Sequence, residues 1–76
     1  MPVLTTKRVL EIAKAAVADR NWPWLQPVEI SQRRTWLVFG KLQWHVLTNA
    51  RSRGANVRLV IDDVSGRVVQ SGVAPL

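Results

Sequence analysis

A change in the spacing of apolar residues near residue 20 constrains the fold of this chain more than any other feature. Between Thr5 and Arg20, apolar residues recur at intervals of three and four, a spacing typical of one stripe of a helix. That stripe consists of Val9, Ile12, Ala13, Ala16 and Val17. From Val28 onward the pattern is strand-like, and no later segment has helical spacing. We therefore expect one amino-terminal helix, capped by Thr5 or Thr6, whose stripe is buried against a sheet.

The segment from Val28 to Asn49 can be divided in two ways. Gly40-Lys41 fits a two-residue hairpin loop, which would pair Leu37 with Trp44. The alternative is one very long strand. We favour the hairpin because strands usually contain about five or six residues. Its first arm is still long, so we expect a bend or bulge between Gln32 and Thr35.

Two further strands are expected after a polar loop. Val57 to Asp62 places Val57, Leu59 and Ile61 on one side of a strand, and Arg67 to Ser71 follows the turn Asp63-Val64-Ser65-Gly66. Gly66 should have a positive φ, because this turn calls for a left-handed residue. The 76 residues allow a single domain, residues 1–76. The predicted fold class is α+β, with the helix packed on an antiparallel meander of about four strands.

The end of the chain resembles a known kind of domain. The hairpin from Ile61 to Val69, preceded by an alternating strand and an alanine-rich helix, resembles the closing hairpin of PepSY-like domains. It is also similar to short, immunity-type members of the cystatin-like class. The resemblance implies one helix on a small antiparallel sheet, a role in binding or inhibiting other proteins such as peptidases or toxins, and no catalytic residues.

The composition of the chain says more about where the protein is found in the cell than about what it does. The formal net charge is +6, which attracts nucleic acids, acidic protein surfaces and anionic membranes alike. The absence of cysteine excludes a disulfide scaffold and thiol catalysis. Charged residues interrupt the amino-terminal apolar residues, unlike in a signal peptide, and no apolar run is long enough to span a membrane. We expect a cytoplasmic protein with no membrane partner.

Residues that could carry chemistry are few. His45 is the only histidine, so a histidine metal cluster is excluded and a strand position without a catalytic role is favoured. Asp62 and Asp63 lie where turn-capping carboxylates are expected, and a cation site would need more ligands. We expect no enzyme activity, no cofactor and no metal.

Tryptophan and arginine provide the candidate binding residues. One helix covers only one face of a sheet, and the strands carry apolar residues of both parities, so the second face should need a cover. Self-association of two sheets into a homodimer, with Trp36 or Trp44 in or next to the interface, is the first expectation; a heterologous protein partner is the second. In the alternative, Trp22 and Trp24 in the loop after the helix wrap around and close the core without any partner. The candidate partner-binding residues are Trp22, Trp24, Trp36, Trp44, Arg34, Arg51 and Arg53.

The predicted function is a small, non-catalytic protein-binding or inhibitor-like accessory module that self-associates. The alternative is a basic nucleic-acid-binding protein, in which exposed tryptophan and arginine side chains share one surface.

Overall fold

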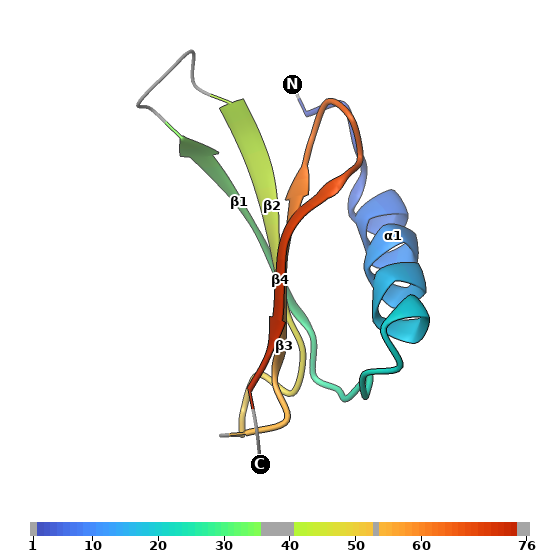
Figure 1. Cartoon of the computed structure of the whole chain (residues 1–76). Helices are drawn as coiled ribbons and strands as arrows, with labels where there is room; N and C mark the ends of the chain where they lie inside the picture. Colours follow the sequence, from blue (N-terminus) through green and yellow to red (C-terminus); the bar gives the residue numbers. More distant parts are fainter. Residues whose placement is uncertain (1, 36–40, 53, 75–76) are drawn as a thin grey trace.

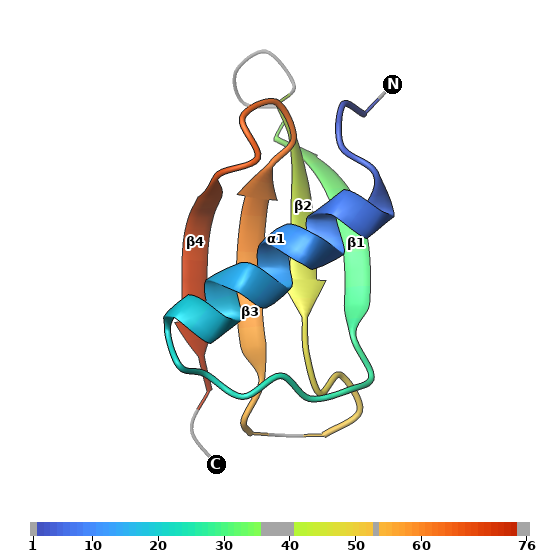
Figure 2. The same ribbon diagram turned by 90° about the vertical axis from the view of Figure 1, so that its right-hand side faces the viewer.

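The fold consists of one helix and a four-stranded antiparallel sheet (Figure 1). The computed structural model describes residues 2–35, 41–52 and 54–74. The elements are α1 (Thr6–Asp19), β1 (Glu29–Thr35), β2 (Lys41–Leu47), β3 (Val57–Asp62) and β4 (Val68–Val73). Neighbouring strands in the chain are neighbours in the sheet, in the order β1-β2-β3-β4, and α1 crosses one face diagonally (Figure 2). The predicted α+β fold is confirmed.

Both ends of α1 are set by local signals in the sequence. The Thr5 side chain is the N-cap and accepts a hydrogen bond from the Arg8 backbone N–H at 3.1 Å. Arg20 is the C-cap, and Asn21 follows with a φ of 57°, the left-handed conformation that asparagine tolerates. The predicted cap is confirmed, at Thr5.

The core lies between α1 and the sheet. Val9, Ala13 and Val17 are fully buried, and Ile12 and Ala16 pack against the same cluster, as the stripe predicts. The sheet contributes the buried residues Trp44, Val46, Val57, Leu59 and Ile61. Trp22 and Trp24 are half-buried against this core, so the connection after α1 folds back onto the helix-covered side.

The segment from 28 to 49 is a hairpin, but its register differs from the prediction. β1 and β2 pair with Thr35 opposite Lys41, so Lys41 belongs to a strand and the two-residue Gly40-Lys41 loop is wrong. Trp44 lies opposite Gln32, whereas the tight hairpin placed it opposite Leu37. Gly40 and residues 36–39 lie outside the described residues.

The last hairpin follows its sequence signals. Gly66 has a φ of 72°, as predicted, and Asp62 caps the turn by accepting hydrogen bonds from the Ser65 backbone and hydroxyl, each at 2.9 Å. The irregularity that was expected in β1 lies instead in the hairpin of β3 and β4. The pairing of β3 with β4 shifts between Val60 and Ile61, while the described pairs of β1 and β2 keep one register.

Candidate functional site

The sheet face opposite α1 is the surface that the described elements leave uncovered (Figure 1). We call it the open face. Its side chains come from alternate residues of each strand, because successive residues of a strand point to opposite sides. They belong to Glu29, Ser31, Arg33, Gln43, His45, Leu47, Arg58, Val60, Asp62 and Gln70, with Gly72 beside them.

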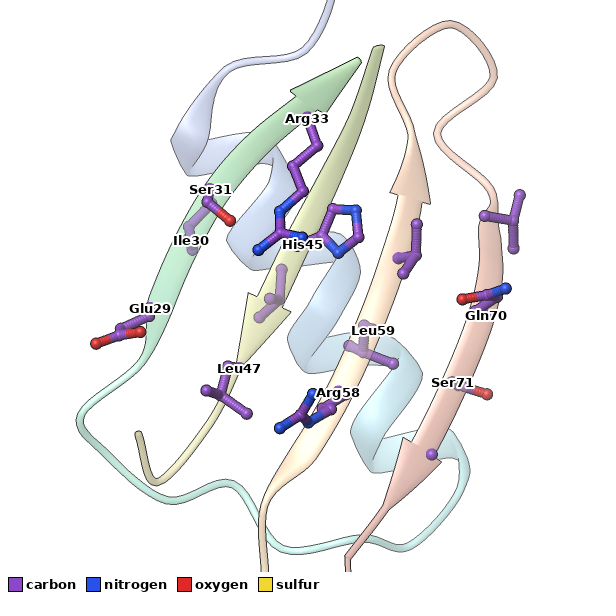
Figure 3. A pocket seen from close by; sticks show the side chains of 14 residues that line it. Glu29, Ile30, Ser31, Arg33, His45, Leu47, Arg58, Leu59, Gln70 and Ser71 are labelled. Atoms are coloured by element: carbon purple, nitrogen blue, oxygen red, sulfur yellow. The ribbon is translucent and has the colours of Figure 1, made fainter. Parts of the chain in front are cut away.

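The strand register arranges these side chains in rows across the sheet. Ser31 lies opposite His45, His45 opposite Val60, and Val60 opposite Gln70. A wide, open groove of about 1120 Å³ follows this face and is lined by residues of all four strands (Figure 3). The groove therefore lies on paired strands, whose register sets which residues are neighbours along it.

The open face carries two apolar side chains that are diagonal neighbours, Val60 in β3 and Leu47 at the end of β2. Val60 is only 9% exposed although it points away from α1, and Leu47 is half-buried on the neighbouring strand. Both line the groove. A partner that covered this region would bury apolar area at its centre, the usual arrangement of a protein interface.

Charges of both signs flank these two apolar side chains. Arg33 and Arg58 come from β1 and β3, and Glu29 and Asp62 come from the same two strands. Arg33 and Asp62 lie in one row, separated by Gln43, whereas Glu29 and Arg58 lie in another, separated by Leu47. Among the residues whose side chains the structure describes, the open face thus carries two arginines and two carboxylates.

His45 is the titratable group at the centre of the groove. Figure 3 shows the Arg33 side chain running alongside the imidazole from the neighbouring strand. Burial, and secondly the charge of Arg33, lower the pKa of His45 below its ordinary value. The imidazole is therefore neutral near pH 7 and can both donate and accept a hydrogen bond.

The loop tryptophans predicted as binding residues lie on the helix-covered side instead of the open face. The Arg20 guanidinium carbon is 5.7 Å from the centre of a Trp22 ring, and Lys14 Nζ is 5.9 Å from that of Trp24. Both tryptophans also pack against the core. Cation–π contacts with the helix therefore occupy part of the ring surface that the prediction assigned to a partner.

Of the remaining predicted residues, the three that the structure describes do not form one surface. Trp44 is 3% exposed beneath α1, so it cannot contribute to an interface on the open face. Arg34 is exposed but points to the opposite side of β1 from Arg33, and Arg51 is exposed in the loop between β2 and β3. Trp36 and Arg53 lie outside the described residues. Trp44, which the sheet-to-sheet dimer would have placed in or next to its interface, is therefore corrected to the helix-covered core.

The sequence-based prediction did not place Arg33, His45 and Arg58 together in one groove. Alternation within the strands could have placed all three on one side, but only with the correct pairing of β1 and β2. The register between β1 and β2 was the missing information.

A second polar cluster lies at the carboxyl end of β3, on the side of α1. Asp63 is 3% exposed, and its carboxylate accepts hydrogen bonds from Trp44 Nε1 at 2.8 Å and from the backbone N–H groups of Val3 at 2.7 Å and Leu4 at 2.9 Å. Burial raises the pKa of Asp63, but these three hydrogen bonds outweigh it and hold the pKa below its usual range. The cluster fastens the segment before α1 to the sheet, which is a structural role.

Neither a metal centre nor a membrane span is found in the described part of the chain. No group of three or more histidine, cysteine, aspartate or glutamate side chains is placed there to hold an ion. The described helix is too short and too polar to cross a bilayer.

Comparison with known proteins gives no further assignment. The chain matches no protein-family model, no curated protein and no solved structure.

Proposed function

We propose that this protein is a non-catalytic protein-binding module of the cytoplasm that binds its partner through the open face. The observation that carries the proposal is the composition of the groove: Val60 and Leu47 are diagonal neighbours on adjacent strands, and charged side chains of both signs lie around them. Protein interfaces have this anatomy, with an apolar centre and a polar rim. Arg33 and Arg58 supply the residue type most enriched, beside aromatics, at interface hot spots.

The charges of the open face favour a protein over a nucleic acid. A surface that binds phosphates needs a clear excess of cations, and the described open face has Glu29 and Asp62 against Arg33 and Arg58. Single-strand binding also uses exposed aromatic rings for stacking, and the described side chains of this face include none except His45. A nucleic-acid-binding role is therefore the second choice.

An inhibitor-like role is one form of this proposal. The resemblance of the closing hairpin to PepSY-like and immunity-type domains supports it, since those families act by binding other proteins. The partner on the open face can be a second copy of the chain or a different protein.

The proposal is tested by comparing two charge reversals in affinity capture from the source cells, followed by mass spectrometry. Arg58→Glu changes the charge on the open face, whereas Arg67→Glu makes the same change in the exposed turn before β4. We expect a specific protein to be retained by the wild type and by Arg67→Glu and to be reduced at least tenfold by Arg58→Glu. Equal retention of every captured protein by both variants would contradict the proposal.

Salt dependence separates the second choice from the first. Wild-type protein is titrated with a single-stranded oligonucleotide at rising salt concentration, because each neutralised phosphate releases counterions and steepens the dependence. Tight binding that weakens steeply with salt, and that Arg58→Glu abolishes, would assign the open face to nucleic acid.

A further inference from the structure

The two edges of the sheet differ in what they expose. β1 carries the exposed charged residues Glu29, Arg33 and Arg34, which discourage pairing with another strand. β4 has the sequence VVQSGV, without a charged residue or proline. Val69 is 49% exposed and Val73 is 39% exposed, and both are on this edge strand. β1 is therefore a protected edge and β4 an unprotected one.

The backbone of β4 is free to pair on its outer side. The Ala74 N–H donates to the Asn56 carbonyl at 2.7 Å, which fixes the alternation of hydrogen bonds along this antiparallel pair. Gln70 and Gly72 then bond toward β3, while the N–H and C=O groups of Ser71 and Val73 point away from it. Among the described elements, none lies beside this edge (Figure 2). Unpaired groups of this kind are a template for another strand.

We propose that β4 pairs antiparallel with β4 of a second copy of this chain, which joins two sheets into one continuous eight-stranded sheet. A two-fold axis close to Ser71 sets the outward groups of each copy opposite those of the other. Because β4 carries no charge, this pairing opposes no like charges, whereas β1 against β1 would bring arginines together. The arrangement is closed, since it uses both unprotected edges and leaves the two protected ones outside.

The geometry of this pairing has a consequence for the open face. Antiparallel pairing across an edge places the two-fold axis perpendicular to the sheet, so both helices lie on one side and both open faces on the other. The groove reaches the edge, because Val69, Gln70 and Gly72 line it (Figure 3). The dimer would therefore present two grooves side by side, although the pairing does not depend on either groove binding a partner.

Two substitutions on β4 and one control test the pairing by sedimentation equilibrium. Ser71→Pro removes an outward N–H without removing a bond to β3, and Val73→Lys adds a charge to the edge. Val64→Lys is the control, because Val64 is also exposed, at 78%, but lies in the turn after β3. We expect a wild-type dimer at micromolar concentration, an increase of at least tenfold in the dimer Kd for Ser71→Pro and Val73→Lys, and no change for Val64→Lys.

Circular dichroism checks that each variant folds, and Val73→Lys alone decides the test if the proline variant does not. Concentration-dependent protection of the Ser71 and Val73 amides from hydrogen exchange would support the same pairing independently. A wild type that is monomeric at several hundred micromolar overturns the proposal. So does a dimer that both β4 variants leave unchanged, or an open-ended polymer.

Discussion

The indole Nε1 of Trp44 donates a hydrogen bond of 2.8 Å to Oδ1 of Asp63, and both residues are 3% exposed. Nineteen positions separate them in the chain. The bond joins the middle of β2 to the residue just after β3, while the same carboxylate holds the backbone of Val3 and Leu4. A tryptophan predicted to meet a partner is thus an internal donor, and its contribution to stability can be measured.

Two tryptophan-to-phenylalanine substitutions separate the hydrogen bond from the ring. Trp44→Phe leaves a buried carboxylate without one of its donors, so we expect the thermal midpoint to fall by at least about 4 °C in a domain of this size. Trp24→Phe is the matched change, because Trp24 Nε1 is buried without a partner among the described residues. Its midpoint should move less than half as far, and a larger loss for Trp24→Phe than for Trp44→Phe would contradict the assignment.

Acid should destabilise the protein through Asp63. Because the pKa of this carboxyl is lower in the folded protein than in the unfolded chain, the unfolded chain binds more protons between the two values. The stabilisation is present above the ordinary pKa of about 4 and is lost as the pH falls through the folded value. Urea melts at several pH values should show this loss in the wild type and a much weaker one in Asp63→Asn.

Asp19→Asn serves as the control for that series, since Asp19 is an exposed residue at the end of α1. It should keep the acid sensitivity of the wild type. If Asp63→Asn keeps it too, the hydrogen bonds to Asp63 are not its source.

The parts of the fold that sequence predicted depend on local signals. The spacing of Val9, Ala13 and Val17 is sufficient to locate the buried side of α1, and Asn21 and Gly66 mark backbone positions that need positive φ. Each of these signals depends only on residues close in sequence to the feature that it predicts. Their agreement with the structure follows from that short range.

The candidate site depends on long-range pairing and was therefore harder to predict. A strand register that changes by an odd number of residues exchanges the two faces, so pairing Trp44 with Leu37 instead of Gln32 assigns β1 to the wrong side. β2 carries apolar residues on both faces and β1 has only Ile30, so the pattern alone does not resolve the choice. The open face and its groove became visible only with the correct register.

Gly66, in the turn before β4, and Gly72, within β4, give a matched test of backbone strain. Gly66 has a φ of 72°, and an added Cβ there would lie 3.5 Å from Ile12 Cδ1, an ordinary contact. Gly66→Ala should therefore lose about 1 kcal/mol of unfolding free energy through its backbone conformation alone. Gly72→Ala meets no atom within 4 Å, and its unfolding free energy should be unchanged or slightly higher. Equal losses in denaturant melts would refute this explanation.

His45 reports on the open face because it is the only histidine in the chain, so its ring signals in an NMR titration need no assignment. Burial is the larger cause of its lowered pKa, and the charge of Arg33 is the smaller. Arg33→Gln should raise the pKa of His45 only partly, leaving it below the ordinary value of about 6.5. Arg67→Gln, which removes a charge from the distant turn, should leave the titration unchanged. An unshifted titration in Arg33→Gln would mean that the guanidinium does not lie beside the imidazole in solution. That result would contradict the arrangement of side chains described for the groove.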